Sequence, residues 1–401
     1  MPQIDLFLKQ MLEAQASDLH LSSDTPIMMR IHGKMRKMGD QVYPSEYLEK
    51  LLQEIVPERN AKEFTSCHDT DFAYAMSDTA RFRINIFLDQ RGIGAVCRMV
   101  PCKILTTEEL DLPESVTNLC YLTKGLVLVT GPTGSGKSTT LSSMIDLINR
   151  TREGHIITIE DPIEFLHQNQ NCLINQREVK VHTQSFKKAL RAALREDPDV
   201  ILVGELRDLE TVEIALETAE TGHLVFGTLH TTTAASSIDR LIDQFPANQQ
   251  AQIRTMLAES LKGVISQVLL RKMDGSGRIL AMEILLVNHA VAANIREGKT
   301  HQINMAISTG KRQGMAALQD SLMELVIKKI VDPFEAYTKA VDKESFLRET
   351  ERLGIPVSLY QMSPKSKRMP QQPPYFPGGT RTEASKTLIN STRPESQKKN
   401  P

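Results

Sequence analysis

A single eight-residue stretch constrains the fold of this chain more than any other feature. Residues Gly131 to Ser138, GPTGSGKS, match the phosphate-binding pattern G-x-x-x-x-G-K-[ST]. The apolar run Leu126 to Thr130 precedes the pattern, and residues that favour a helix follow it. A strand before the loop and a helix after it form the context in which this pattern binds phosphate, and we expect it within an α/β domain.

The residue types in this loop suit a nucleoside triphosphate. Glycines let backbone N–H groups curl around phosphates, and the following helix presents its positive end to the same anion. Lys137 would reach the β and γ phosphates, and the Ser138 hydroxyl would coordinate Mg²⁺. We therefore expect ATP and Mg²⁺ here, with the nucleotide bound by Gly131, Thr133, Gly134, Ser135, Gly136, Lys137, Ser138 and Thr139.

Strands and helices alternate along the region that carries the loop, a pattern that predicts a parallel sheet covered by helices on both faces. The expected strands are Leu126–Thr130, His155–Ile159, Val200–Val203 and Leu224–Thr228, with helices at Thr139–Asn149 and Phe186–Arg195. After Ala247 the chain is expected to be mostly helical, at Gln249–Leu270, His289–Arg296, Met315–Ile330 and Asp332–Ala340.

The remaining parts of the chain divide by composition. Residues 1–100 indicate a small α+β domain, in which Arg81–Val100 reads as two strands joined by a turn near Asp89–Gly94. Residues 101–116 form a linker, residues 117–350 the ATPase domain, and residues 351–401 a disordered, basic, Pro-rich tail. From Gln361 onward the tail holds seven of the 19 prolines, eight Lys or Arg and two acidic residues.

Composition also excludes several classes of protein. The formal net charge is -1, so no overall field attracts nucleic acid or an anionic membrane. The five cysteines contain no C-x-x-C pair, which suits a reducing compartment better than a disulfide framework or a zinc site. No apolar run reaches the roughly 18 residues of a membrane span. We expect a soluble, cytoplasmic protein without membrane insertion.

Two acidic clusters follow apolar strands and are expected near the phosphates, because carboxyl ends of parallel strands border the ligand crevice. The first holds Glu160, Asp161 and Glu164, with Pro162 turning the chain. The second places Glu205 after the strand Val200–Val203. We assign Glu205 to Mg²⁺, partly through water, and Glu164 to polarising the attacking water, although the two roles could be exchanged.

Two histidines flank the fourth strand. His223 precedes it and His230 follows it, and a neutral imidazole there could sense the γ phosphate. Their spacing fits no metal site, and each could equally be structural.

Four motifs together resemble one known family. GPTGSGKSTT at 131, ITIEDPIEF at 157, REDPDVILVGELRD at 195 and ETGHLVFGTLHTTTAASSIDRLIDQFP at 220 are similar to the retraction ATPases of type IV pili, the PilT family, within the type II/IV secretion ATPase superfamily. The likeness covers residues from about 4 to 350, and SDLHLS at Ser17 and RFRINIF at Arg81 fit it.

The resemblance implies a RecA-like ATPase domain with a smaller PAS-like N-terminal domain, assembled as a homohexamer with ATP between subunits. It implies a motor for pilus retraction and twitching motility, peripheral to the inner membrane, whose partners are the inner-membrane pilus platform protein and other pilus ATPases. It also implies that Arg83 and Arg98 reach the γ phosphate, that Glu160, Asp161 and Glu164 form an acidic box, and that His223 and His230 form a histidine box.

Alternatives within the superfamily remain. The assembly and secretion branch commonly carries a four-cysteine zinc insertion, and the lack of C-x-x-C pairs favours retraction over it. Retraction motors often show a helix reading A-I-R-N-L-I-R-E, and the equivalent here departs from it at Ala292 and Ala293. An accessory retraction paralogue therefore stays open.

Two other classes are also considered. A RecA-like motor on nucleic acid needs a basic groove with stacking aromatic residues, and the region from Leu126 to Ala340 shows no such clustering. A regulatory subunit that binds nucleotide without turnover is disfavoured because Lys137, Glu164 and Glu205 are all kept.

Overall fold

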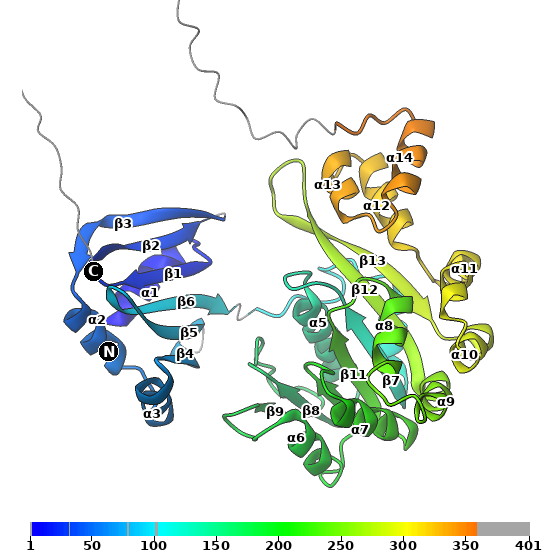
Figure 1. Cartoon of the computed structure of the whole chain (residues 1–401), viewed down its shortest axis with the longest axis horizontal. Coiled ribbons are helices and arrows are strands. Elements are labelled where there is room, and N and C mark those ends of the chain that lie inside the picture. Colours follow the sequence, from blue (N-terminus) through cyan, green and yellow to red (C-terminus); the bar gives the residue numbers. More distant parts are fainter. Residues whose placement is uncertain (1, 32, 78–79, 101–102, 359–401) are drawn as a thin grey trace, which may run out of the picture. The chain divides into compact units, whose positions relative to one another are not determined.

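The computed structural model describes residues 2–31, 33–77, 80–100 and 103–358. Most of the tail predicted for residues 351–401 lies outside these ranges, and so do two residues of the predicted linker, 101 and 102. The described part of the chain contains two sheets, one before and one after the linker (Figure 1). Within that part, no helix has the length and apolar character needed to cross a bilayer.

The N-terminal sheet is antiparallel, with strand order β3-β2-β1-β6-β5-β4. Buried residues alternate with more accessible ones along most of β5, as in a strand with one covered face. The helices α1 and α2 supply apolar residues to the same core as the strands. The elements are α1 (Ile4–Glu13), β1 (Asp18–Ser22), β2 (Thr25–Ile31), β3 (Lys34–Tyr43), α2 (Ser45–Gln53), α3 (Glu58–Cys67), β4 (Asp69–Ser77), β5 (Ala80–Asp89) and β6 (Gly92–Val100).

The second sheet has seven strands in the order β13-β12-β7-β11-β10-β8-β9. Neighbours run parallel throughout, except that β13 is antiparallel to β12. The α/β fold class expected from the sequence is confirmed. The strands are β7 (Gly125–Thr130), β8 (His155–Glu160), β9 (Leu173–Glu178), β10 (Val200–Val203), β11 (Leu224–Leu229), β12 (Leu261–Arg271) and β13 (Arg278–Leu286).

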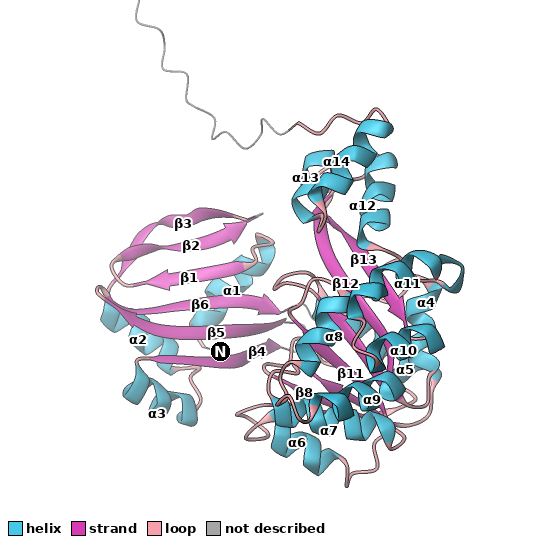
Figure 2. Cartoon of the chain, turned by 45° about the vertical axis from the view of Figure 1, so that its right-hand side comes forward, coloured by secondary structure: helices cyan, strands magenta, loops and turns pink. Residues whose placement is uncertain are grey.

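Helices cover both faces of this sheet, which explains the unbroken apolar strands. Leu126 and Leu128 of β7 face one core with α6, α7, α8 and α9, whereas Val127 and Val129 face the opposite core with α5 (Figure 2). The helices are α4 (Glu114–Thr117), α5 (Lys137–Thr151), α6 (Phe186–Ala193), α7 (Leu209–Glu220), α8 (Ala234–Ile242), α9 (Gln250–Ser260), α10 (His289–Arg296), α11 (Ile303–Thr309), α12 (Leu318–Ile327), α13 (Pro333–Lys339) and α14 (Lys343–Arg352), with short 3-10 turns at Asn118–Tyr121, Thr300–Gln302 and Lys311–Gln313.

The region after Ala247 corrects one prediction. The helix expected over Gln249–Leu270 ends at Ser260, and the rest of that segment is strand β12. Strand β13 was not predicted at all. Both strands are buried on two faces, so their apolar residues follow no period of two, and a short apolar run of this kind is hard to tell from a buried helix.

Candidate nucleotide site

The phosphate loop connects β7 to α5 at the carboxyl edge of the sheet. Gly136 is the N-cap of α5 with a φ of 90°, a conformation that L side chains rarely adopt. Gly131 has a φ of 144°, and a Cβ atom there would overlap with the carbonyl oxygen of Gln267. Two positions of the loop therefore require glycine for backbone reasons that are independent of any ligand.

Gln267 on β12 is a supporting residue that the motif does not contain. It is buried, and its Nε2 donates to the carbonyl oxygen of Ser135 at 2.8 Å. The Oγ atom of Ser135 is itself buried and has no hydrogen-bond partner among the residues that the structure describes. The sequence offers only a weak signal for this residue, a glutamine within the largely apolar segment 264–270, because a buried polar group needs a hydrogen-bond partner.

Lys137 begins α5, and its ammonium group lies among carbonyl groups and charged side chains. Nζ donates to the carbonyl oxygens of Gly131 at 2.8 Å and Pro132 at 3.3 Å, and lies 3.4 Å from His230 Nδ1. Burial lowers the pKa of Lys137, while the negative charges of Glu205 and Glu164 oppose that shift. The structure thus brings both predicted carboxylates into electrostatic range of the lysine.

Glu205 and His230 follow adjacent strands, β10 and β11. His230 Nε2 lies 3.5 Å from Glu205 Oε1, so the imidazole stands between that carboxylate and the ammonium of Lys137. Arg207 Nε is 3.7 Å from the same oxygen of Glu205. The hydroxyl of Thr228 on β11 donates to the carbonyl oxygen of Gly204, which ties the chain before Glu205 to the neighbouring strand.

The acidic residues at and after the end of β8 comprise one half-buried carboxylate, Glu160, and two exposed ones. Glu160 accepts hydrogen bonds from Thr158 Oγ1 at 2.6 Å and Gln176 Nε2 at 3.2 Å. Burial raises the pKa of Glu160, and these hydrogen bonds oppose the shift. Asp161 and Glu164 are exposed. Glu164 is therefore accessible to a ligand, whereas Glu160 is held by its hydrogen bonds to Thr158 and Gln176.

The other predicted loop residues lie where a phosphate can reach them. Thr133 and Gly134 are exposed at the turn of the loop, and Ser138 and Thr139 are half-buried in the first turn of α5.

His223 does not join this group. It precedes β11, and its carbonyl oxygen accepts from Gly125 at the start of β7, the end of the strand opposite the phosphate loop. Six residues of β11 separate it from His230, roughly 20 Å of strand. Its Nδ1 lies 3.1 Å from the carbonyl oxygen of Thr218, which indicates a local structural contact.

The two predicted arginines are neighbours on the N-terminal sheet. Arg83 on β5 and Arg98 on β6 are directly opposite in the strand register. Arg83 Nε lies 3.3 Å from Asp71, and Arg98 Nε donates to the buried Asp18 at 2.8 Å. Both guanidinium groups remain exposed enough to take a further anionic partner.

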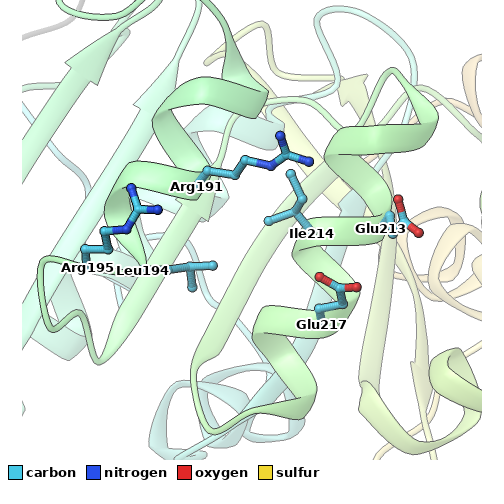
Figure 3. Close-up of a pocket in the computed structure, with 6 residues that line it drawn as sticks. All are labelled: Arg191, Leu194, Arg195, Glu213, Ile214 and Glu217. Carbon is cyan, nitrogen blue, oxygen red and sulfur yellow. The ribbon is translucent and has the colours of Figure 1, made fainter.

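A separate surface cavity of about 400 Å³ lies between α6 and α7 (Figure 3). Its lining mixes two arginines with two glutamates and includes no residue of the phosphate loop: Arg191, Leu194, Arg195, Glu213, Ile214 and Glu217. We do not assign nucleotide to it, because it lacks the ring of backbone amides and the helix N-terminus that phosphate binding uses.

The residues of the phosphate loop fit a magnesium nucleotide. Among the described residues the Ser135 hydroxyl has no partner, and the three positive-φ positions of the loop, Gly131, Gly134 and Gly136, are all glycines. Ser138 and Glu205 supply oxygen atoms, which are the ligands that Mg²⁺ prefers. Lys137 and the start of α5 supply positive charge for phosphate.

Comparison with known proteins agrees with this geometry. A family model described as type II/IV secretion system protein matches residues 1–355. The chain is 50% identical to "Type IV pilus retractation ATPase PilT" of Pseudomonas aeruginosa, over 82% of this chain and 96% of that protein. It is 36% identical to "Type IV pilus ATPase PilU" of the same species, over 88% and 92%.

A solved structure, "Crystal Structure of the Pilus Retraction Motor PilT and Bound ADP", matches with a TM-score of 0.81 and 43% identity, covering 87% of this chain and 99% of that one. This match supports a RecA-like ATPase fold with an N-terminal domain. The chain therefore belongs to the type II/IV secretion system protein family.

Proposed function

We propose that this chain is an ATP-hydrolysing motor that drives retraction of a type IV pilus. The observation that carries the proposal is the position of Lys137, which lies in the phosphate loop, 3.4 Å from His230 and within electrostatic range of Glu164 and Glu205. The similarity to two pilus ATPases, PilT and PilU of Pseudomonas aeruginosa, supports a motor for a pilus over other ATP-driven functions.

In the proposed reaction, Lys137 exchanges its carbonyl partners for β- and γ-phosphate oxygens. Ser138 and Glu205 would hold Mg²⁺, partly through water, and the bound ion would supply positive charge to the phosphates. The exposed carboxylate of Glu164 orients the attacking water. His230, which lies beside Glu205, senses the γ phosphate. Thr133, Gly134, Gly136 and Thr139 contribute backbone or hydroxyl contacts to the phosphates.

The same proposal includes an assembly. Residues 1–100 and 117–350 form the two domains of each subunit in a homohexamer, and Arg83 and Arg98 contact the γ phosphate of a nucleotide shared with a neighbouring subunit. Arginine suits this task because its fork of donors neutralises charge spread over the transferring phosphoryl group. The ring acts at the cytoplasmic face of the inner membrane, on the pilus platform protein and alongside other pilus ATPases.

A second candidate is an accessory retraction paralogue. The observation in its favour is helix α10, where Ala292 and Ala293 replace polar residues common in retraction motors. The 36% identity to PilU is lower than the 50% identity to PilT, so we place retraction first.

Steady-state ATPase activity tests the enzymatic part of the proposal. Lys137→Ala is expected to abolish turnover, because it removes the charge that binds the β and γ phosphates. Lys124→Ala is the matched control, since Lys124 is an exposed lysine just before β7. Near-normal turnover by Lys137→Ala rejects the assignment.

Deletion of the gene in its own organism tests the cellular part. Cells with many immobile surface pili are expected if the motor retracts, and pilus-free cells would instead indicate assembly. Near-normal retraction with a second pilus ATPase still present would favour the accessory role.

A further inference from the structure

The segment between β8 and β9, residues 161–172, contains neither helix nor strand. Its shape therefore depends on side-chain contacts. Ile163 and Phe165 are buried, and Glu164 lies exposed between them. These two apolar residues hold the segment against the core. Apolar contacts are not directional, so they do not by themselves determine the backbone conformation of the segment.

Gln176 on β9 supplies the directional contacts. Its Nε2 donates to Glu160 Oε1 at 3.2 Å and to the carbonyl oxygen of Phe165 at 2.8 Å. Its Oε1 accepts from the backbone N–H of His167 at 2.8 Å. One amide thus binds the segment before Glu164 and at two points after it. Glu178, two residues along β9, accepts from the backbone N–H of Ile163 at 3.1 Å.

We propose that Gln176 is a positioning residue for ATP hydrolysis, which holds the segment from Glu160 to His167 so that Glu164 faces the γ phosphate. The inference rests on the role proposed above for Glu164. It adds a residue that lies on a neighbouring strand, outside the acidic and phosphate-loop motifs, and that acts through its bonds to that segment without touching the nucleotide.

The test uses the full chain and a pair of neighbouring substitutions. Gln176→Met keeps the length of the side chain and removes all three hydrogen bonds. Asn175→Met is the control: Asn175 is also an amide on β9, but it is exposed and contacts His155 instead. kcat and KM for ATP, ADP affinity and the melting temperature are measured for both.

Gln176→Met is expected to lower kcat about 10- to 100-fold, because a displacement of about 1 Å in a catalytic group can cost about 100-fold. ADP affinity and melting temperature should match those of Asn175→Met. A kcat equal to that of the control overturns the proposal. So does a parallel fall in ADP affinity and melting temperature, since that pattern marks a purely structural role.

A second variant, Gln176→Glu, tests the proposal in case Gln176→Met does not fold. Gln176→Glu keeps the acceptor for His167 but loses both donors, and it places a second carboxylate beside Glu160. The titratable neighbours are Glu160, Glu164 and His167, and burial lowers the pKa of His167 to about 4, so it stays neutral above pH 6. Like charges at close range favour uptake of a proton, which restores one donor.

Activity of Gln176→Glu relative to the unaltered chain should therefore rise as the pH falls from about 8 to about 6, whereas the relative activity of Gln176→Met should stay level. Level ratios for both variants contradict the positioning role. Glu164→Gln separates this inference from the proposed function. If Glu164→Gln turns over normally, the role of Glu164 fails, and the inference fails with it; if Glu164→Gln is inactive while Gln176→Met is active, only the inference fails.

Discussion

Gly131→Ala tests whether the phosphate loop has the backbone that the structure assigns to it. The φ of 144° at this position costs about 1–3 kcal/mol for a residue with a side chain. The new Cβ would overlap with the carbonyl oxygen of Gln267 and lie 2.6 Å from Ser135 Oγ. Overpacking of this kind adds about 1–3 kcal/mol, so we expect a total loss near 4 kcal/mol.

Gly134→Ala is the matched control in the same loop. Its φ of 78° is also left-handed, but no heavy atom lies within 4 Å of the added Cβ. The expected loss is therefore about 1–2 kcal/mol, from backbone strain alone.

Scanning calorimetry without nucleotide measures the difference. For a domain of this size, 1 kcal/mol shifts the melting temperature by about 2–4 °C. We expect a decrease of roughly 8–16 °C for Gly131→Ala and roughly 3–6 °C for Gly134→Ala. Equal melting temperatures for the two variants would show that Gly131 does not pack against Gln267 as described, and would refute the reasoning.

Three further predictions concern charged and titratable groups. Burial alone would raise the pKa of Asp18, but hydrogen bonds from Arg98 and Ser17 outweigh this effect, so the pKa lies below its usual value. The stabilisation of the folded state by the ionised Asp18 is present at neutral pH and is lost as the pH falls below about 4. Urea unfolding should therefore show that Arg98→Gln destabilises the chain more at pH 7 than at pH 3, and an equal loss at both would contradict the pairing. Arg83→Ala should lower ATPase activity only in the assembled ring, measured with gel filtration, and equal loss in monomers would count against an arginine acting between subunits. His230→Ala should reduce kcat about 100-fold with little change in KM, as for loss of one aligned donor in an active site, and an unchanged kcat would remove His230 from the site.

The parts of the fold that were predictable from sequence are those with unambiguous patterns. The strands around the phosphate loop are continuous apolar runs bounded by helices, and all four expected strands are present. The β5–β6 hairpin was also predicted correctly. By contrast, β12 and β13 carry buried apolar residues on both faces, and β12 directly follows helix α9, so local periodicity could not separate these strands from a buried helix.

Some residues of the candidate site could likewise be placed from the sequence, and others could not. Glu164, Glu205 and His230 all follow a strand of the sheet, and their approach to Lys137 could be anticipated from the rule for carboxyl ends of parallel strands. By the same rule His223 precedes its strand, so it lies at the other end of the sheet. Gln176 and Gln267 could not be placed from sequence, because their contacts depend on the order of strands within the sheet.

A structure of the chain with Mg²⁺ and a slowly hydrolysed ATP analogue tests the central claim most directly. We expect Lys137 Nζ on the γ phosphate, Glu205 bound to Mg²⁺ directly or through one water, and Glu164 within hydrogen-bond reach of the water in line with the γ phosphorus. A triphosphate bound elsewhere, or one bound at Lys137 with both carboxylates turned away from it, would contradict the account.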